Sequence, residues 1–325
     1  MHYFCTYFDQ HYLTRGLTLY RSLKRHSGPF RIWVLCLDDP TYEVLSKLNL
    51  PDLLPVALKD FEQNDKALLA SKQDRTLIEY YFTCSPSWPL YILNNFPEVD
   101  LITYLDADLF FYSSPAPIFE ELEEKSILII GHRFPERLRD KELYGIYNVG
   151  LLVFRNDRFG RECLQWWRER CLEWCHDYPE IGRFADQKYL DDWPTRFQRV
   201  VVLENKGAGL APWNWMNYKI ETKAGQTTVD GAPLIFYHFH RLKILNRWLY
   251  DPVCGGESYG MMPFVMRWRI YHPYVQALKK TARWIRQRVP RPSLNHSYVQ
   301  DNDYGWRSLI AKVVQGRIMV NYGLE

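Results

Sequence analysis

The 325-residue chain has no apolar run near the roughly 20 residues that a membrane-spanning helix requires. It also shows no signal peptide before HYFCTYF at residues 2–8, a stretch whose aromatic residues already predict a β-strand. We therefore expect neither a membrane-spanning nor a secreted protein, and we predict a cytoplasmic location.

The cysteines lack the pattern of a disulfide framework. The seven cysteines form an odd set without regular spacing, which indicates reduced thiols. Cys171, Cys175 and His176 could provide part of a zinc site, but no second pair of ligands follows at zinc-site spacing. We interpret these three as packing residues.

A glycine-rich phosphate loop is also missing. Strand-like residues 2–8, helix-like residues 13–25 and strand-like residues 30–37 form a βαβ opening without G-x-G-x-x-G, so the usual dinucleotide fold is not indicated. Further strands rich in β-branched and aromatic residues are predicted at 100–105, 126–130, 149–154, 199–203 and 233–239. Because helical patterns lie between several of them, the sequence predicts an α/β sheet with crossover connections.

Acidic residues are absent from one long segment. Between Met261 and Pro292 there are eight Lys or Arg and no Asp or Glu, although the net charge of the whole chain is only +3. A helix predicted at 274–289 carries an apolar stripe and basic residues on its other faces. Two interpretations stay open: an amphipathic helix on an anionic membrane surface, or a helix docked on the domain. Nucleic acid is not expected, because no recognised binding motif accompanies the charge.

Two carboxylates stand out against this background in LITYLDADLFFY, residues 101–112. Asp106 and Asp108, two residues apart at the end of a strand, can point to the same side. Like charges this close raise one pKa unless a cation neutralises them, and Mg²⁺ or Mn²⁺ does so while bridging phosphates. The alternative is a turn in which the acids cap a helix or contact backbone amides.

Five blocks in order resemble the glycosyltransferases of the GT-A fold, most closely family 8. They are the opening CTYFDQHY, YLDADLFF with its D-x-D, YNVGLL at 147–152, the D-Q pair in FADQKYLDDW, and IFYHF at 235–239. The resemblance covers about residues 1–245. It implies an α/β, Rossmann-like GT-A mixed sheet flanked by helices. We accordingly divide the chain into a catalytic domain at 1–250 and a basic, aromatic helical extension at 251–325, whose segment 261–292 could contact a membrane or the acceptor.

The resemblance also implies roles for matching positions. Asp106, Asp108 and His238 would hold the metal, Mn²⁺ or Mg²⁺. His240, on the same strand face, could replace His238 or help to bind phosphate. The donor sugar would meet Asn148, Asp186 and Gln187, the nucleotide would meet Thr6, Asp9 and Tyr12, and a sugar or the acceptor would meet Trp213 and Asn214. Structural roles stay open for several of them: a turn for Asn148, a helix cap for Asp186, and the core for a Trp.

The chain departs from the family pattern at basic and acidic positions. The late G-x-x-K-P-W block is missing, so the diphosphate would meet Arg241, Lys243 or Arg247, of which we assign Lys243. The second acid of the D-Q-D segment is replaced by Lys188. The helix before D-x-D lacks the frequent Arg, and Arg75, about two turns earlier, would take its place at the nucleotide.

The reaction implied is metal-dependent transfer of a hexose from a nucleotide sugar, a UDP-hexose, to a saccharide or lipid-linked acceptor with retention. An inverting enzyme would need a general base, for which Asp191 and Asp192 are candidates without support. Three alternatives stay open: a sugar nucleotidyltransferase, a noncatalytic sugar-nucleotide-binding protein, and a haloacid-dehalogenase-type phosphatase. The last expects Thr or Val where this chain has Phe110. Donor, acceptor, linkage and oligomeric state are not set by the sequence.

Overall fold

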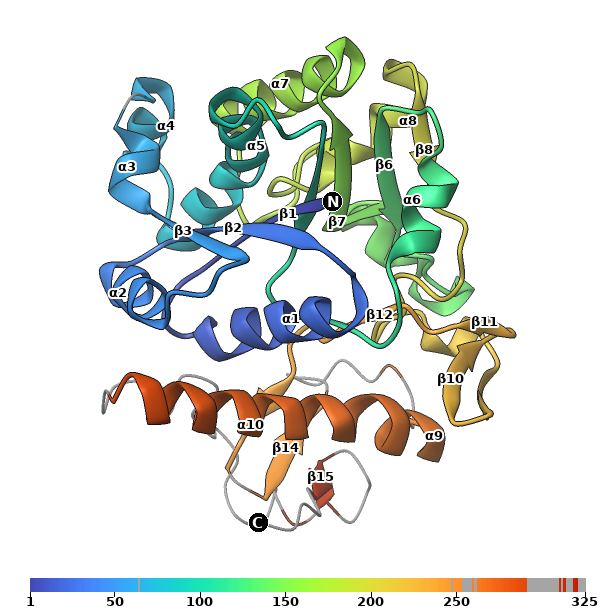
Figure 1. Cartoon of the computed structure of the whole chain (residues 1–325). Helices are drawn as coiled ribbons and strands as arrows, with labels where there is room; N and C mark the ends of the chain where they lie inside the picture. Colours follow the sequence, from blue (N-terminus) through green and yellow to red (C-terminus); the bar gives the residue numbers. More distant parts are fainter. Residues whose placement is uncertain are drawn as a thin grey trace.

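A seven-stranded mixed sheet with helices on both faces forms the centre of the protein (Figure 1). The computed structural model describes residues 1–63, 65–246, 248–252, 259, 262–290, 310, 312–313 and 318–320. The strand order is β3-β2-β1-β4-β7-β6-β8, with β7 antiparallel to both of its neighbours. The predicted α/β mixed sheet is confirmed.

The first half of the sheet is built from consecutive parallel βα units. Its elements are β1 (His2–Phe8), α1 (Leu13–His26), β2 (Phe30–Cys36), α2 (Asp39–Leu48), β3 (Leu53–Ala57), α3 (Leu58–Glu62), α4 (Lys66–Ser71) and α5 (Leu77–Asn95). Strand β3 was not predicted, because Pro55 lies within it. A proline is tolerated there since β3 is an edge strand of the sheet.

The second half adds β4 next to β1 and then reverses direction. Its elements are β4 (Leu101–Leu105), β5 (Leu109–Phe111), α6 (Ala116–Leu122), β6 (Ile127–Gly131), β7 (Tyr147–Arg155), α7 (Arg158–Glu173), α8 (Trp193–Arg196) and β8 (Val200–Val202). Because β7 is antiparallel, its first residues lie at the same edge of the sheet as the last residues of β1, β4 and β6. Polar residues at these four strand ends therefore converge.

The remaining elements form small sheets and a helical end. They are β9 (Ile220–Lys223), β10 (Gln226–Val229), β11 (Ala232–Pro233), β12 (Phe236–His238), β13 (Lys243–Ile244), β14 (Leu249–Asp251), α9 (Phe264–Met266), α10 (His272–Arg288) and β15 (Met319–Val320). Strand β12 pairs antiparallel with β5, which joins this part of the chain to the end of β4. No helix among the described residues is both long and apolar enough to cross a bilayer.

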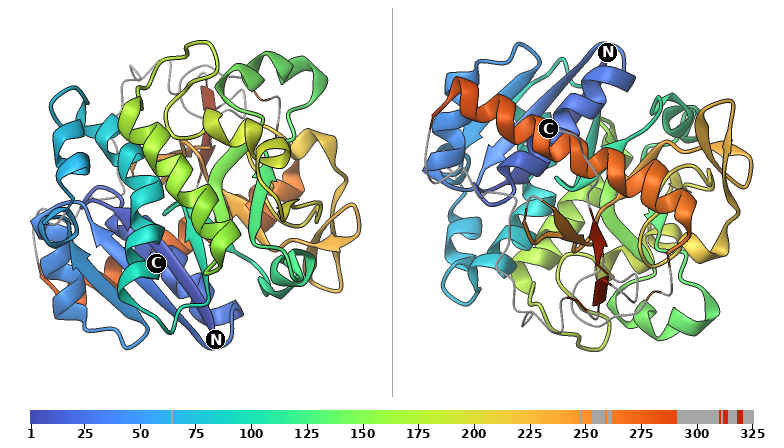
Figure 2. Two further views of the ribbon diagram at one scale, coloured as in Figure 1. Left: turned by 90° about the horizontal axis from the view of Figure 1, so that it is seen from above. Right: turned by 90° about the horizontal axis from the view of Figure 1, so that it is seen from below.

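Helix α10 lies beside α1 on one face of the sheet, while α5 and α7 cover the other (Figures 1 and 2). Its apolar residues Val275, Leu278, Ala282 and Ile285 are buried, and Ile285 joins the core that α1 and the sheet share. Of the two interpretations of this segment, the helix docked on the domain is confirmed. The end of α10 therefore shares a core with residues before 250, and the division of the chain at 250 stays a prediction.

The thiols behave as packing residues in the described part of the chain. Cys163, Cys171 and Cys175 are free, fully buried and part of the core beneath α5 and α7. His176, which follows them, lies 3.1 Å from Arg75 Nη1 and 3.2 Å from Glu79 Oε1.

Glu79 ties the N-terminus of α5 to the loop at 176–185. Its carboxylate accepts hydrogen bonds from the backbone N–H of Thr76 at 2.7 Å and of Asp177 at 2.9 Å, and lies 3.2 Å from His176 Nδ1. Burial alone would raise the pKa of Glu79, but these hydrogen bonds outweigh it and lower the pKa to about 2. The loop itself is closed by a hydrogen bond from Ala185 N–H to His176 O at 3.0 Å.

Replacing Glu79 by glutamine is expected to lower the free energy of unfolding at pH 7 by about 2 kcal/mol, because the charged acceptor is lost. Since the folded-state pKa is lowered, the stability that Glu79 contributes is present above about pH 4.5 and is lost as the pH falls towards 2. Urea unfolding checks the value, with the exposed Glu162→Gln on α7 as the control. A loss equal to that of the control would contradict the prediction.

Candidate active site

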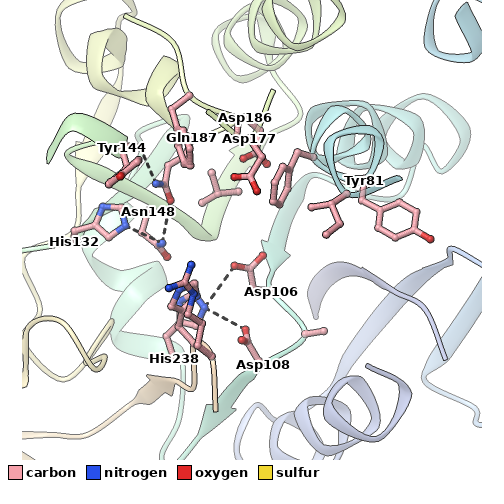
Figure 3. Close-up of a pocket in the computed structure, with 18 of the residues that line it drawn as sticks. Tyr81, Asp106, Asp108, His132, Tyr144, Asn148, Asp177, Asp186, Gln187 and His238 are labelled. Atoms are coloured by element: carbon pink, nitrogen blue, oxygen red, sulfur yellow. Dashed lines mark hydrogen bonds and ion pairs between the residues drawn. The ribbon is translucent and has the colours of Figure 1, made fainter. Parts of the chain in front are cut away.

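A cavity of about 840 Å³ lies at the edge of the sheet where β1 and β4 end and β7 begins (Figure 3). Polar residues line its middle, among them Asp106, Asp108, Asn148, Gln187 and His238. Aromatic side chains line both ends. In open α/β sheets such an edge is the usual place of ligand binding.

The acidic pair lies in the short turn between β4 and β5. The backbone N–H of Asp106 donates to the carbonyl of Gly150 at 2.9 Å, which fixes the turn against β7. The antiparallel pairing of β5 with β12 puts His238 opposite Leu109. As a result His238 Nε2 lies 3.2 Å from Asp108 Oδ1 and 3.7 Å from Asp106 Oδ2. A residue about 130 positions away in the chain thus completes the cluster.

The two carboxyl groups differ in their ionisation. Burial, together with the charge of Asp108, raises the pKa of Asp106 to about 6. Burial acts on Asp108 as well, but the charge and the hydrogen bond of His238 outweigh it and lower the pKa to about 2. The cluster therefore carries negative charge at neutral pH although it is buried. Buried negative charge favours the binding of a cation.

The three side chains fit a divalent cation. One ligand atom from each of Asp106, Asp108 and His238 lies within 4.8 Å of the others. Two ligands about 2.1 Å from one ion are about 3 Å apart at right angles and about 4.2 Å apart when opposite each other. The separations of 3.2 Å and 3.7 Å between His238 and the two carboxylates lie in this range. Two carboxylates with one imidazole suit Mn²⁺ or Mg²⁺.

Next to this cluster, Asn148 and Gln187 are joined by a hydrogen bond. Asn148 Oδ1 accepts from the backbone N–H of Gly150 at 2.9 Å, and Asn148 Nδ2 lies 3.2 Å from Gln187 Oε1. A Cβ atom at position 150 would lie 2.5 Å from Asn148 Oδ1 and 2.9 Å from His238 Nδ1. A side chain at position 150 would therefore clash with Asn148 and His238. This explains physically why glycine stands two residues after Asn148 in the block YNVGLL.

Asp186 is buried at the cavity wall, 5% exposed, after Ala185 in the left-handed region with φ of 45°. Burial raises the pKa of Asp186 to about 7, and the charge of Asp106 adds to the effect. The backbone carbonyl of Asp186 accepts from the indole N–H of Trp167 at 2.7 Å, which anchors it to α7. Asp186 thus faces the cavity from a fixed position (Figure 3).

The end of the cavity near β1 is lined by Asp9, Tyr12, Leu37, Ile78 and Tyr81. There, Asp9 Oδ1 accepts from the backbone N–H of His11 at 2.9 Å and of Tyr12 at 3.1 Å, so its position is fixed by the turn.

At the opposite end the rings of His132 and Phe134 are stacked, with centroids 4.7 Å apart. The edge of Trp213 meets His132 at 5.2 Å and His238 at 5.3 Å. Tyr144 and Lys141 also line this end.

Four residues assigned from the sequence lie outside the cavity lining, all of them in the described part of the chain: Thr6, Arg75, Asn214 and Lys243. Thr6 is buried in β1, where its carbonyl accepts from the Trp88 indole. Arg75 lies against Asp74 and His176. Asn214 bonds the carbonyls of His132 and Gly209. The side chains of Arg75 and Asn214 thus have partners outside the cavity, while Thr6 is buried and Lys243 lies in a small sheet. Their assignment to ligand contacts stays a prediction.

Two residues that follow β12 lie at the cavity, whereas Lys243 does not. His240 and Arg241 line the cavity, whereas Lys243 pairs with Asp251 within the β13–β14 ladder. Arg241 has a left-handed backbone, φ 57°, and its charge acts on Asp177 in the loop at 176–185. Arg247 lies outside the described residues. Arg241 was one of three candidates from the sequence for contact with the diphosphate. Its place at the cavity depends on the turn that follows β12, which the sequence does not reveal.

His132 is a residue of the cavity that the sequence did not single out. It directly follows β6, whose end lies at the same edge of the sheet. Its Nε2 lies 3.2 Å from Asn148 Nδ2. Its position directly after a predicted strand is a signal that could have made it a candidate site residue. No sequence motif contains it.

Comparisons with known proteins agree with this architecture. No protein-family model matches the sequence. Two relatives from Bacillus subtilis (strain 168), YfnF and YfnD, both described as uncharacterized, are similar. YfnF is 37% identical over 253 residues, covering 75% of this chain and 82% of its own. YfnD is 31% identical over 286 residues, covering 87% and 89%.

Among solved structures, the galactosyltransferase LgtC in complex with donor and acceptor sugar analogs superposes with a TM-score of 0.51 and 13% identity, over 86% of this chain and 95% of LgtC. The structure of an active-site mutant of LgtC gives a TM-score of 0.50 at 13% identity, over 82% and 99%. At such identity the likeness concerns the fold. The chain has the GT-A fold of these glycosyltransferases, as predicted.

Proposed function

Since the chain belongs to one family with YfnF and YfnD of Bacillus subtilis, we propose for this member the activity that its own fold and cavity support best, metal-dependent glycosyl transfer from a nucleotide sugar. One observation carries the proposal. The cluster of Asp106, Asp108 and His238 faces a large cavity whose two ends are both aromatic. A cation at such a cluster holds a diphosphate between a base at one end and a sugar at the other.

The proposed donor is a UDP-hexose, with its base at the end lined by Asp9, Tyr12 and Tyr81. Aromatic rings stack on a base, and a fixed carboxylate accepts hydrogen bonds from ribose hydroxyls. Mn²⁺ or Mg²⁺, when bound, neutralises the charge that grows on the departing diphosphate. Arg241 supplies a second positive charge for the same oxygens.

The hexose lies between Asn148, Asp186 and Gln187 in this proposal. Amide and carboxyl groups at fixed positions orient the sugar hydroxyls and thereby the anomeric carbon. In this arrangement Gln187 would lie near that carbon, and because its amide is uncharged, no covalent carboxylate intermediate is invoked. We propose retention of configuration, as the resemblance to family 8 implies.

The acceptor is a saccharide at the end lined by Phe134, Trp213 and Tyr144. Aromatic side chains pack against the apolar face of a sugar ring, while hydroxyls remain free for polar contacts. The neighbouring Lys141 adds a positive charge at this end. This favours a sugar that carries an anionic group nearby.

A panel of nucleotide sugars with and without Mn²⁺ tests the proposal by thermal shift and by product analysis. One UDP-hexose at a hundred times its Kd is expected to stabilise the protein by about 2.7 kcal/mol, and only with metal. Transfer or slow hydrolysis would then release UDP. Release of pyrophosphate would instead identify a nucleotidyltransferase, and binding without turnover a noncatalytic protein. No binding of any sugar nucleotide would refute the proposal.

A second proposal concerns the exposed face of α10. Lys280, Arg283 and Arg286 are exposed there, and no acidic residue interrupts the segment. Helices α9 and α10 form one continuous helical segment, residues 264–288. At its N-terminal end Phe264 is 75% exposed, and its ring lies 5.8 Å from that of Trp268. Because the apolar stripe of α10 is buried, we propose that the basic face and this aromatic pair contact an anionic lipid surface that carries the acceptor.

Reversing three charges on α10 is expected to abolish binding to anionic vesicles. Lys280→Glu, Arg283→Glu and Arg286→Glu together should weaken binding about a hundredfold or more, since each basic residue near such a surface contributes about 1 kcal/mol. Co-sedimentation with phosphatidylglycerol vesicles measures the effect. The control carries the same change at the exposed Lys59, Lys66 and Lys125. Equal binding by both triple variants, or none by the unmodified protein, would remove the idea.

A further inference from the structure

A row of three hydrogen-bonded side chains crosses the cavity wall beside Asp106 and His238: His132, Asn148 and Gln187 (Figure 3). The row starts from the backbone, because Gly150 N–H donates to an atom of the Asn148 amide at 2.9 Å. A backbone N–H can only donate, so the amide atom facing it must be the oxygen. The orientation of the Asn148 amide is thereby determined.

The other end of that amide then determines its two neighbours. Asn148 Nδ2 lies 3.2 Å from Gln187 Oε1 and 3.2 Å from His132 Nε2. An NH₂ group has two protons and no acceptor site, so both partners must accept. His132 Nε2 therefore carries a lone pair, and the ring is neutral with its proton on Nδ1. Gln187 turns its oxygen towards Asn148, while its own NH₂ donates to the Tyr144 carbonyl at 2.9 Å.

The surroundings of His132 favour this neutral form. The ring is 6% exposed and lies between the stacked ring of Phe134 and the edge of Trp213. Burial lowers the pKa of His132 to about 3. The carbonyls of Ile146 and Gly145 oppose this weakly, and neither forms a well-aligned hydrogen bond with Nδ1. At neutral pH the ring is thus an acceptor towards Asn148.

We propose that His132 is a positioning residue for glycosyl transfer: its Nε2 holds the Asn148 amide so that Gln187 presents its carbonyl oxygen, and not its NH₂, to the anomeric carbon. The inference rests on the proposed function. Positive charge develops on the sugar ring as the diphosphate leaves, and a carbonyl oxygen stabilises that charge whereas an NH₂ group opposes it. If Nε2 of His132 is removed, the Asn148 amide keeps only Gly150 and Gln187 as hydrogen-bond partners. Asn148 is then held less firmly, and so is the Gln187 side chain that bonds to it.

Kinetics of two His132 variants test the role. His132→Phe keeps a ring to stack on Phe134 but removes the acceptor, and kcat for turnover of the UDP-hexose is expected to fall 10- to 100-fold with the donor KM within twofold. His132→Gln, whose Oε1 can accept from Asn148, is expected to recover at least half of that loss on a logarithmic scale. His26→Phe, a change in a histidine at the end of α1, is the control. A kcat of His132→Phe within twofold of the unmodified protein would overturn the inference.

Nitrogen NMR of the ¹⁵N-histidine-labelled protein provides a readout independent of activity. The His132 ring is expected to show a proton on Nδ1 and none on Nε2 at pH 7. In Asn148→Asp, where a carboxylate faces the ring, Nε2 is expected to gain a proton. A protonated Nε2 in the unmodified protein would overturn the inference even if the protein is an active transferase. The expected NMR signature without turnover of any nucleotide sugar would instead overturn the proposed function, and the role of His132 with it.

Discussion

Replacing Asp108 by alanine is expected to reduce metal-dependent turnover of the donor about a thousandfold and to abolish the stabilisation of the protein by UDP-sugar with Mn²⁺. Asp108 is the carboxylate closest to His238, at 3.2 Å, and hydrogen bonding to His238 keeps it ionised. Its loss removes one of three ligands, and with it the several kcal/mol that a metal contributes to stabilising a leaving diphosphate. Asp106→Ala and His238→Ala are expected to give losses of the same order.

Isothermal titration with Mn²⁺ separates binding from catalysis in these variants. The unmodified protein should bind one ion per chain in the presence of UDP, and Asp108→Ala none. Asp52→Ala, at a carboxylate paired with Lys24 on α1, is the matched control. If Asp108→Ala still bound Mn²⁺ and turned over the donor at more than a tenth of the normal rate, the metal site would be elsewhere.

Replacing Asp186 by asparagine is expected to stabilise the metal-free protein at high pH while lowering its activity. Burial raises the pKa of Asp186 to about 7 from an ordinary value of 3.8, so the folded state holds a proton that the unfolded state has lost. Folding stability therefore falls as the pH rises from about 4 to 7 and stays low above that range. A shift of about three pKa units corresponds to up to about 4 kcal/mol at pH 8, which Asp186→Asn should recover.

Urea unfolding in EDTA at pH 5 and pH 8 measures this difference. The gain of Asp186→Asn over the unmodified protein should be about 2.6 kcal/mol larger at pH 8 than at pH 5. Asp192→Asn, at an exposed position near the end of η2 (Lys188–Asp192), should show no such dependence. A gain that does not change with pH would mean that Asp186 is ionised in the folded protein at pH 5. Such a trade of stability for a buried carboxyl group is typical of functional sites.

The sequence predicted the sheet and the acidic pair because each has a local signal. Strand β4 is a dense run of β-branched and aromatic residues, and Asp106 follows it directly. The link from the pair to His238 came from a resemblance in block order, whereas the physical cause is the register of β5 with β12, which no local pattern contains. The role of α10 was left open because an apolar stripe looks alike on a docked helix and on an interfacial one.

The assigned residues that lie outside the cavity lining share a reason. Thr6 was assigned by its position in a resembling block, Lys243 by its nearness to an expected lysine, and Arg75 as a substitute for a missing arginine. In the structure Thr6 is buried with its carbonyl bound to Trp88, the Arg75 side chain lies against His176, and Lys243 belongs to β13. Conversely, His132 belongs to no motif and enters the site only because β6 ends at the same sheet edge as β4. Sequence position identifies the strands that meet at a site, but tertiary contacts decide which of their side chains are available.

The pairing of β5 with β12 has a consequence for how the protein resists unfolding. An ion held by Asp106, Asp108 and His238 would act as a cross-link between segments about 130 residues apart, and closing so long a loop removes much conformational entropy from the unfolded chain. Depletion of metal should accordingly loosen the segment from β12 onward first, so that proteases cleave there while the βα units of the N-terminal half remain intact.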